Sequence, residues 1–548
     1  MKQERYFYWF LAIALGALLL NLNSWGVLEA SEARYAEISR EMFRSRNLLQ
    51  PTLLNIWHFH KPPVTFWLTD LGLGLFRVNA FGARFMLQLS LILQGVLIYL
   101  ISQQLFGVKL RSILAVAIYF SLPLSLVSAR NLTTDNFLTT LVLGVIYGMT
   151  VYYCQRKIWG IYGTALVIGI GFLTKGPAIF VVPFGYWCYL IFAHRVRYQM
   201  PIKHFILSLL LCVTLGISWY VIVAHKMPPL TDYFLGRQLA SRVLDADTFE
   251  RTKAGWFYPL IFSTTTLPWL PTYLASFFAS GDQRKSNLEK LQSLYWLVLP
   301  FIVFSLTSSK LMMYLLPLYP SLAMLLSGVV IEMKDLQLKR LTKIFIGFYW
   351  FLGAIALVAP FFVRVSSTKL NVTWQMIVSA LLVFAVPILT YRLVQADRRL
   401  RLVAISMGSL LMFFIYGGYL IGANELSFGG TRPLVKFIQA QGLENEPVLV
   451  YNRLLPSLAF NLDRDIITLN NGGVERETQF QTNDNWKRFW LDLREPAAVE
   501  RLTKLVQSPS VLVVKGTLPD ELSWIQPNYG HAESLGKWTI YYRLEARS

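Results

Sequence analysis

Long apolar stretches recur along this chain, and short polar breaks separate them. Runs such as Phe7 to Leu20, Phe205 to Ala224 and Ile344 to Val363 approach the length of about 20 residues that a helix needs to cross a bilayer. Together with the positions of Lys and Arg, this pattern predicts about thirteen membrane-spanning helices. They are expected near residues 7–23, 82–104, 108–128, 133–154, 158–173, 177–193, 204–224, 256–278, 291–307, 311–331, 344–363, 372–391 and 402–422.

Composition supports a membrane protein. The 548 residues are 55% hydrophobic and 15% charged, whereas a soluble globular chain is about one quarter charged. The first apolar run is interpreted as a retained span, since no small-x-small cleavage site follows it. The three cysteines Cys154, Cys188 and Cys212 have no metal-like spacing and are interpreted as small core residues.

The formal net charge of +20 raises the question of a nucleic-acid partner. The basic residues, however, concentrate in alternate short loops, which is the positive-inside rule of membrane topology. The charge therefore indicates a cytoplasmic N-terminus and, with an odd number of spans, an extracytoplasmic C-terminus. This topology depends on the break at Thr174–Pro177, because without it every later loop changes side.

Three polar segments are expected on the extracytoplasmic side. Two are loops, at 24–81 and 225–255, within a transmembrane domain of residues 1–423. The third is the tail, 424–548, which has strand-like runs at 447–451, 511–514 and 538–542 and a helical pattern at 432–441. This pattern predicts a small C-terminal α/β domain.

The first loop begins with a charged helical pattern. Ser31 is placed to cap a helix on which Glu32, Tyr35 and Ser39 share one face. Glu29 and Glu32 fit a catalytic base or an anchor for a cationic group. The same stretch equally fits a solvated amphipathic helix with ion pairs three residues apart, Glu37 with Arg40 and Glu41 with Arg44.

The same loop continues with His58, His60 and Lys61, followed by two prolines. Lys61 fits a phosphate-binding residue, because its ammonium attracts that charge and the prolines stiffen the loop. The alternative role is anchoring the loop to lipid headgroups. The two histidines fit metal ligands or interfacial polar residues, and without a third partner no metal site is predicted.

Several ionisable residues are expected at the outer ends of spans. Asp135 lies at the mouth of one span, where an ionisable residue suggests function and a helix N-cap is the alternative. Lys175, Arg242 and Lys310 are basic residues on the side where basic residues are scarce. Convergence of such cations would suit the phosphate of a lipid.

Ordered motifs carry a resemblance to a known family. The segment Glu32–Met42, followed by Pro51–Leu53 and Phe59–Pro63, strongly resembles the first extracytoplasmic loop of the lipid A aminoarabinose transferases. That family is similar, more distantly, to the protein O-mannosyltransferases. Further matching stretches are Thr174–Gly176, Tyr233–Phe234 leading to Arg242, Leu267–Trp269 and Ser308–Pro317. The matches cover about residues 20–330.

The resemblance implies a GT-C type glycosyltransferase of the bacterial inner membrane. Such an enzyme takes a sugar, here 4-amino-4-deoxy-L-arabinose or another pentose or hexose, from a polyprenyl-phosphate donor. It gives the sugar to an extracytoplasmic acceptor, most often lipid A or another envelope glycolipid, and it works among membrane lipids. No cofactor is required and a divalent metal is not predicted.

The resemblance also implies residue roles. It assigns the lipid phosphate to Lys61 and Arg242, with Lys175 and Lys310 as further candidates and Tyr314 beside that phosphate. It assigns the acceptor and the reacting centre to Asp135 and the acidic first loop, with Glu29 and Glu32 as catalytic candidates.

Two departures from the family pattern matter. The family has an acidic pair where this chain has Ser31–Glu32, so Glu29 or Glu32 must replace the missing acid, and we favour Glu29. An acidic residue of the second loop is Gln238 here, which leaves the sugar open. A protein O-glycosyltransferase, a lipid or sugar transporter and a non-catalytic scaffold are the alternatives. The ionisable residues cluster at one face without an internal repeat, which argues against a transporter.

Overall fold

The computed structural model describes residues 2–194, 200–234, 236, 253–276, 283–307, 309–365, 368–395, 397–475, 481 and 484–544. The chain forms two compact units. The first comprises Met1–Asn21, Leu87–Ala359 and Trp374–Gly417, and the second comprises Leu22–Met86, Pro360–Thr373 and Gly418–Ser548. The first loop therefore groups with the tail, which the sequence did not predict.

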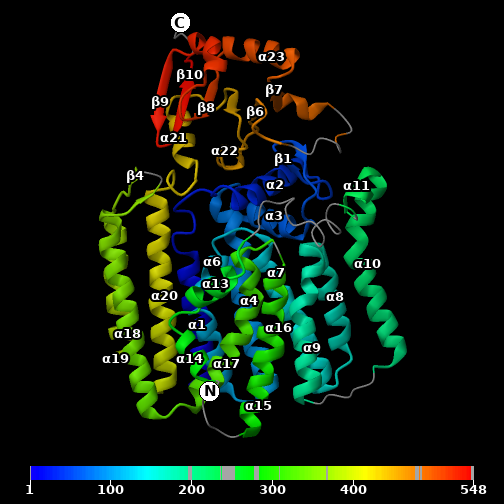
Figure 1. Ribbon diagram of the computed structural model, residues 1–548, viewed down its shortest axis with the longest axis vertical. Coiled ribbons are helices and arrows are strands. Elements are labelled where there is room, and N and C mark those ends of the chain that lie inside the picture. The colour runs from blue at the N-terminus through cyan, green and yellow to red at the C-terminus, as the bar shows by residue number, and fades with distance from the viewer. Residues whose placement is uncertain are drawn as a thin grey trace. The chain divides into compact units, whose positions relative to one another are not determined.

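Helices build the first unit (Figure 1). They are α1 (Lys2–Leu19), α4 (Ala80–Phe106), α5 (Lys109–Tyr119), α6 (Pro123–Ser128), α7 (Thr134–Gln155), α8 (Trp159–Lys175), α9 (Val181–His194), α10 (Ile202–Lys226), α11 (Pro229–Asp232), α13 (Phe257–Thr265), α14 (Leu270–Ser276), α15 (Gln283–Gln292), α16 (Leu299–Leu306), α17 (Tyr319–Glu332), α18 (Asp335–Val358), α19 (Trp374–Leu393) and α20 (Arg398–Ala423). Short helical turns η1 (Gly176–Phe180), η4 (Ser293–Val298), η5 (Met312–Leu318) and η6 (Ala359–Phe361) connect some of them.

The predicted class, a polytopic α-helical membrane protein, is confirmed. Within the described residues, eight helical segments are long and apolar enough to cross a membrane. The count of about thirteen is not confirmed, because some predicted spans are divided into short helices. In the predicted span 256–278, for example, the described residues 256–276 form α13 and α14 on either side of Pro268. Proline lacks a backbone N–H and interrupts a helix.

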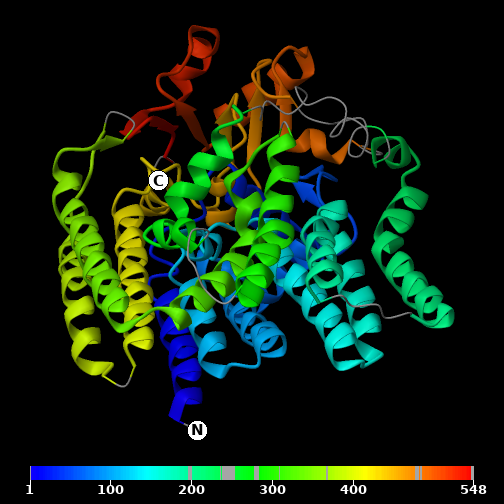
Figure 2. The same ribbon diagram turned by 60° about the horizontal axis from the view of Figure 1, so that its bottom comes forward.

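Large apolar side chains cover the outer faces of several helices. On α10, Leu210 is 57% exposed and Val221 is 57% exposed, and α18 and α19, which lie side by side (Figure 2), carry similar residues. A helix that is apolar on its exposed face requires lipid as its solvent. These faces are therefore the lipid-facing surface of the first unit.

Glycines let α7 and α8 pack closely. A Cβ atom on Gly148 would lie 2.9 Å from the Gly160 carbonyl oxygen, and one on Gly160 would lie 2.6 Å from the Gly148 carbonyl oxygen. Small residues at such positions bring helix backbones together in membranes. At the end of α8 the predicted break is present: Gly176 has φ +62°, and Ile179 folds back against Gly171.

The tail forms the predicted α/β domain. Its six-stranded sheet has the order β7-β6-β5-β8-β10-β9, in which the first four strands are parallel and the last two antiparallel. The elements are α21 (Arg432–Ala440), β5 (Val448–Tyr451), α22 (Pro456–Leu462), β6 (Ile467–Asn470), η7 (Asn485–Arg488), β7 (Trp490–Asp492), α23 (Pro496–Gln507), β8 (Val511–Lys515), η8 (Asp520–Asn528), β9 (His531–Leu535) and β10 (Trp538–Tyr542).

Alternation along the strands gives the sheet two buried faces. Val448 and Val450 pack with α21 and α22, whereas Leu449 packs with α23 on the opposite face. This period of two is the expected pattern of a strand covered on both sides.

The first loop is an ordered part of the second unit. It contains α2 (Ser31–Ser45), the hairpin of β1 (Thr52–Leu53) and β2 (Ile56–Trp57), and α3 (Val64–Phe76). Two-residue strands β3 (Arg364–Val365) and β4 (Thr368–Lys369) form a separate hairpin. Ile38 and Met42 of α2 and Phe66 of α3 share one apolar core with Val450 and Val513 of the sheet. Burial of these side chains joins the loop to the tail.

Candidate active site

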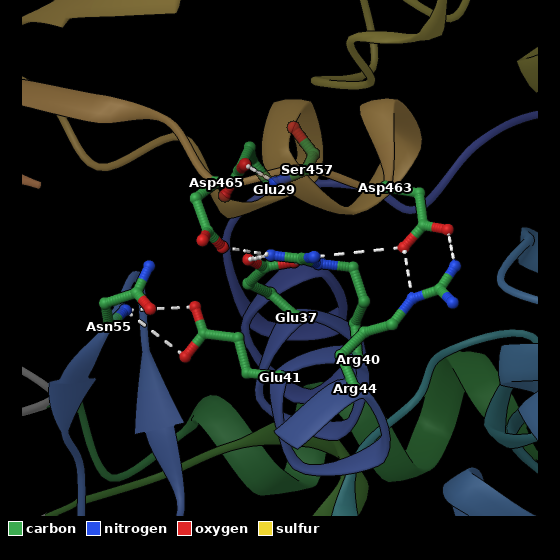
Figure 3. Close-up of polar contacts among 9 residues, drawn as sticks. All are labelled: Glu29, Glu37, Arg40, Glu41, Arg44, Asn55, Ser457, Asp463 and Asp465. Carbon is green, nitrogen blue, oxygen red and sulfur yellow. Dashed lines mark hydrogen bonds and ion pairs between the residues drawn. The ribbon is translucent and has the colours of Figure 1, made fainter.

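Helix α2 carries a buried ion network rather than a solvated charged face (Figure 3). Arg40 donates two hydrogen bonds of 2.8 Å to the Glu37 carboxylate and one of 3.0 Å to Asp465 Oδ1. The side chain of Glu37 is fully buried. The predicted Glu37–Arg40 pair is therefore present, but the interpretation of α2 as a solvated helix is wrong.

The predicted Glu41–Arg44 pair is replaced by longer-range contacts. Glu41 accepts hydrogen bonds of 3.0 and 3.2 Å from the backbone N–H of Asn55, and Arg44 contacts the carboxylate of Asp463 (Figure 3). Asp463 and Asp465 follow α22 in the tail, so the network joins the first loop to the tail within the second unit. The interactions fix α2, and hence the residues on either side of it.

Glu32 is held by a fully buried arginine. Arg84 Nε and Nη2 donate to the two Glu32 oxygens at 2.7 and 2.8 Å, and the backbone N–H of Leu28 donates at 2.9 Å. Arg84 also donates to the carbonyls of Leu22, Trp25 and Gly26 at 2.8 to 3.1 Å. Glu32 thus positions the start of the loop, and a catalytic role for it remains a prediction.

Glu29 contacts the first turn of α22. Its Oε1 accepts a hydrogen bond of 2.7 Å from the backbone N–H of Ser457 (Figure 3). Desolvation raises the pKa of Glu29 to about 7, against the opposing effect of the hydrogen bonds from Ser457. A carboxyl with that pKa is available both as a helix cap and as a general base near neutral pH.

Lys61 lies between β2 and α3, and Pro63 occupies the N-cap position of α3. The rings of His58 and His60 stack with their centroids 4.0 Å apart. Within the described ranges, His, Cys, Asp and Glu form no group of three or more that could hold a metal ion. Lys61 thus lies in the short loop that connects β2 to the beginning of α3.

Asp70 on α3 is a buried carboxyl that the sequence analysis passed over. Ring contact between Tyr35 and Phe66, 5.8 Å apart, and packing of Phe43 on Gly74 show that α2 and α3 run in parallel. Among the described residues, neither Asp70 oxygen has a hydrogen-bond partner. An ionisable residue within the apolar run 64–76 was the available signal.

Asp70 should give the protein a characteristic pH dependence. Desolvation raises its pKa from 3.8 to about 8, so the folded state binds its proton more tightly than the unfolded chain. This linkage reduces stability as pH rises from about 4 to about 8. Asp70→Asn should therefore stabilise the protein at pH 9 by roughly 2–5 kcal/mol, with a smaller gain at pH 5.

Thermal unfolding of both proteins in detergent at pH 5, 7 and 9 checks this expectation. Exposed Asp520 provides the matched control, since Asp520→Asn should leave the pH dependence unchanged. An unchanged pH dependence in Asp70→Asn would contradict the assignment.

The first unit brings together three predicted residues that are distant in sequence. Lys175 Nζ lies 2.5 Å from Asp135 Oδ1 and 4.1 Å from the centroid of the Tyr314 ring. The side chains of Lys175 and Asp135 are 10% and 6% exposed. Thr133, not Asp135, occupies the N-cap of α7, so the capping alternative for Asp135 is wrong. The arrangement is a cation held between a carboxylate and an aromatic face.

Lys310 precedes η5, the helical turn that carries Tyr314. Its Nζ donates a hydrogen bond of 2.7 Å to the Thr307 carbonyl, and the side chain is buried. The next residue, Leu311, is held by the Tyr258 hydroxyl. This hydroxyl accepts a hydrogen bond of 3.2 Å from the Leu311 N–H and donates one of 3.3 Å to the Leu311 carbonyl. Arg242 and Gln238 lie outside the described residues.

Residues 60–220 match the family model described as dolichyl-phosphate-mannose-protein mannosyltransferase. Curated proteins named undecaprenyl phosphate-alpha-4-amino-4-deoxy-L-arabinose arabinosyl transferase are also similar. The one from Proteus mirabilis is 26% identical over 67% of each chain, and that from Aeromonas hydrophila is 29% identical over 62% of each. That from Pseudomonas savastanoi pv. phaseolicola is 30% identical over 59% of this chain and 60% of its own.

This chain is similar to the aminoarabinose transferases. The resemblance inferred from the sequence is thereby confirmed. The matches span 60% to 67% of the length of these three aminoarabinose transferases.

Solved structures extend the likeness to the whole fold. ArnT from Cupriavidus metallidurans in the apo state has a TM-score of 0.76 at 19% identity, covering 99% of this chain and 98% of ArnT. The same ArnT bound to undecaprenyl phosphate has a TM-score of 0.74 at 20% identity, covering 98% of both chains. The chain therefore has the GT-C type fold of ArnT, with its many apolar helices and C-terminal sheet domain.

Proposed function

We propose that this chain is a glycosyltransferase of the bacterial inner membrane that uses an undecaprenyl-phosphate-linked sugar. Its acceptor is lipid A or another envelope glycolipid, and transfer occurs on the extracytoplasmic side. The observation that carries the proposal is the similarity to several curated aminoarabinose transferases, together with the ArnT fold over nearly the full chain. The N-terminus is cytoplasmic and the C-terminus extracytoplasmic, with residues 1–423 as the membrane domain.

The proposed site for the donor phosphate consists of basic side chains. A departing polyprenyl phosphate gains negative charge in the transition state, and a fixed cation in a dry environment stabilises that charge. Lys175 meets this requirement, because Asp135 and the Tyr314 ring hold its ammonium in a largely buried position. Lys61, Arg242 and Lys310 are the further proposed phosphate ligands. These side chains provide the electrostatic stabilisation.

The proposed acceptor side uses the acidic first loop. Ser31 cannot replace a carboxylate at neutral pH, and the oxygens of Glu32 are engaged by Arg84 and the Leu28 N–H. Glu29 is therefore the proposed base, since its pKa of about 7 leaves it partly ionised at neutral pH. Glu32 fixes the backbone that leads to Glu29.

Transfer can be tested with purified protein in liposomes that contain lipid A. Two donors are supplied separately, undecaprenyl phosphate linked to 4-amino-4-deoxy-L-arabinose and undecaprenyl phosphate linked to mannose, and mass spectrometry measures the lipid product. We expect one sugar mass to be added to lipid A. A membrane protein extract serves as the second acceptor, because the family model at residues 60–220 is named for protein mannosylation. No product with either donor on either acceptor would contradict the proposal.

Lys61→Ala should reduce this transfer at least about 100-fold, because the developing phosphate charge loses a donor. The matched control is Lys436→Ala, an exposed lysine of α21 in the same unit. Equal transfer by Lys61→Ala and the control, at equal protein, would remove Lys61 from the site.

Glu29→Gln separates catalysis from helix capping. Glutamine retains an oxygen that accepts the hydrogen bond from Ser457, but it cannot take a proton. In the wild-type protein kcat/KM should rise as pH increases through about 7 and level off above it, because the base must be ionised. Glu29→Gln should lower kcat at least about 100-fold, and its kcat/KM should no longer rise with pH. Its melting temperature should be nearly unchanged. Retention of the rise with pH would assign Glu29 to capping alone.

A further inference from the structure

A cavity of about 650 Å³ opens at the carboxyl ends of β6 and β7 in the C-terminal sheet. Its lining comes from residues 470–475 at and after the end of β6, from the turn η7, from β7 and from the beginning of α23, all within the second unit. The carboxyl edge of a parallel sheet is the usual place for a ligand in α/β domains. The candidate active-site residues described above do not line this cavity.

The backbone at residues 471–473, directly after β6, forms one wall of the cavity. Gly472 has φ +80°, a conformation that favours glycine, and it lines the cavity. Asn452 Oδ1 accepts hydrogen bonds of 3.1 Å from the Asn471 N–H and 2.9 Å from the Gly473 N–H. A Cβ atom on Gly473 would lie 2.3 Å from the Asn452 amide nitrogen, so the loop requires glycine there. The wall is therefore fixed before any ligand binds.

The charges that line the cavity are of both signs, with Lys487, Arg494 and Arg501 as the basic residues. Arg494 donates hydrogen bonds of 2.8 and 2.5 Å to the Asp492 carboxylate. Arg501 donates at 3.0 Å to the carbonyls of Lys487 and Arg488. Glu475 and Glu495 add two carboxylates to the lining. The lining thus has as many carboxylates as basic side chains, so it has no excess positive charge to attract a phosphate or sulfate ligand.

Two tryptophans supply apolar surface to this otherwise polar cavity. Both line the cavity: Trp490, at the start of β7, is 8% exposed, whereas Trp486 in η7 is partly exposed. An indole offers a flat apolar face, and the amides and carboxylates around it offer hydrogen bonds. A sugar ring has the complementary surface, with C–H groups on its faces and hydroxyls at its edge.

We propose that this cavity is a saccharide-binding site, with Trp486 as the stacking surface and with Asp492, Arg494 and Asn470 at the polar rim. The ligand class is a neutral saccharide. That the bound saccharide is the glycan part of the acceptor rests on the proposed function. The tail domain then retains the acceptor through a part of it distant from the reacting group.

Binding is measured without donor by saturation-transfer difference NMR on the full-length protein in detergent. The probes are the neutral disaccharides N,N′-diacetylchitobiose and mannobiose, with inorganic phosphate as the anionic probe. We expect at least one disaccharide to bind, phosphate not to compete, and Trp486→Ala to weaken binding at least tenfold. Trp486→Phe keeps a ring and should retain most of the affinity. Trp524→Ala is the matched control, since Trp524 is 42% exposed and does not line the cavity.

The site assignment is overturned if neither disaccharide binds, if phosphate displaces the disaccharide, or if Trp486→Ala binds as well as the control. In the transfer assay Trp486→Ala should raise the KM for the acceptor at unchanged kcat. Disaccharide binding that depends on Trp486 in a protein without transferase activity would sustain this site and reject the proposed function.

Discussion

Replacing Arg84 with methionine should destabilise the second unit by roughly 3–5 kcal/mol. Arg84 is fully buried and bonds to both oxygens of Glu32 and to three backbone carbonyls. Methionine would leave the Glu32 carboxylate buried without its counter-charge and would leave those carbonyls without a donor. Melting temperature in detergent and the yield of monodisperse protein provide the measurement.

Two further variants test whether a loss of stability in Arg84→Met comes from the broken ion pair. Arg453→Met removes an exposed arginine of the same unit and should change stability little. Adding Glu32→Gln to Arg84→Met removes the orphaned charge and should recover part of the loss. If Arg84→Met alone melts like wild type, the buried pair is not a main stabilising interaction.

Lys175→Ala should lower kcat for sugar transfer by about 10²–10³-fold, because a positioned cation at the departing phosphate contributes on that scale. Its ammonium is held 2.5 Å from Asp135 and over the Tyr314 ring, so its position is set before substrate arrives. The assay is transfer to lipid A in liposomes at equal amounts of folded protein. Lys203→Ala, at the exposed beginning of α10, is the control.

Lys175→Ala also leaves Asp135 buried without its partner, so stability must be separated from catalysis. The double variant Lys175→Met with Asp135→Asn removes both charges and should fold like wild type while remaining inactive. Normal transfer by this double variant would show that Lys175 has no part in the reaction.

The features that could be predicted from the sequence are local ones. Apolar runs and the Lys/Arg distribution identify a membrane protein, and the strand-like runs in the tail identify its sheet. Division of the 256–278 run into α13 and α14 could not be predicted from its apolarity alone. Hydropathy indicates whether a segment lies in lipid or in water, but it does not show whether the segment forms one continuous helix.

The geometry of the site depends on contacts between distant residues, which one sequence does not display. Arg40 pairs with Asp465, 425 positions away, and this partner makes α2 a buried helix rather than a solvated one. Lys175 and Asp135, by contrast, were both selected as isolated charges at helix ends, and the fold places them together. Asp70 is marked in the sequence only by being a single acid in an apolar run, a signal weaker than that of the polar stretches around it.

The shared core of the first loop and the tail has a consequence for biosynthesis. Ile38, Met42 and Phe66 are translated long before the strand residues Val450 and Val513 with which they share a core. Since a chain emerges from the ribosome from its N-terminus, the apolar side chains of the loop stay uncovered until the tail has been made. A chain that stops before β5 would retain its membrane helices but expose this surface, which marks it for chaperones and proteases.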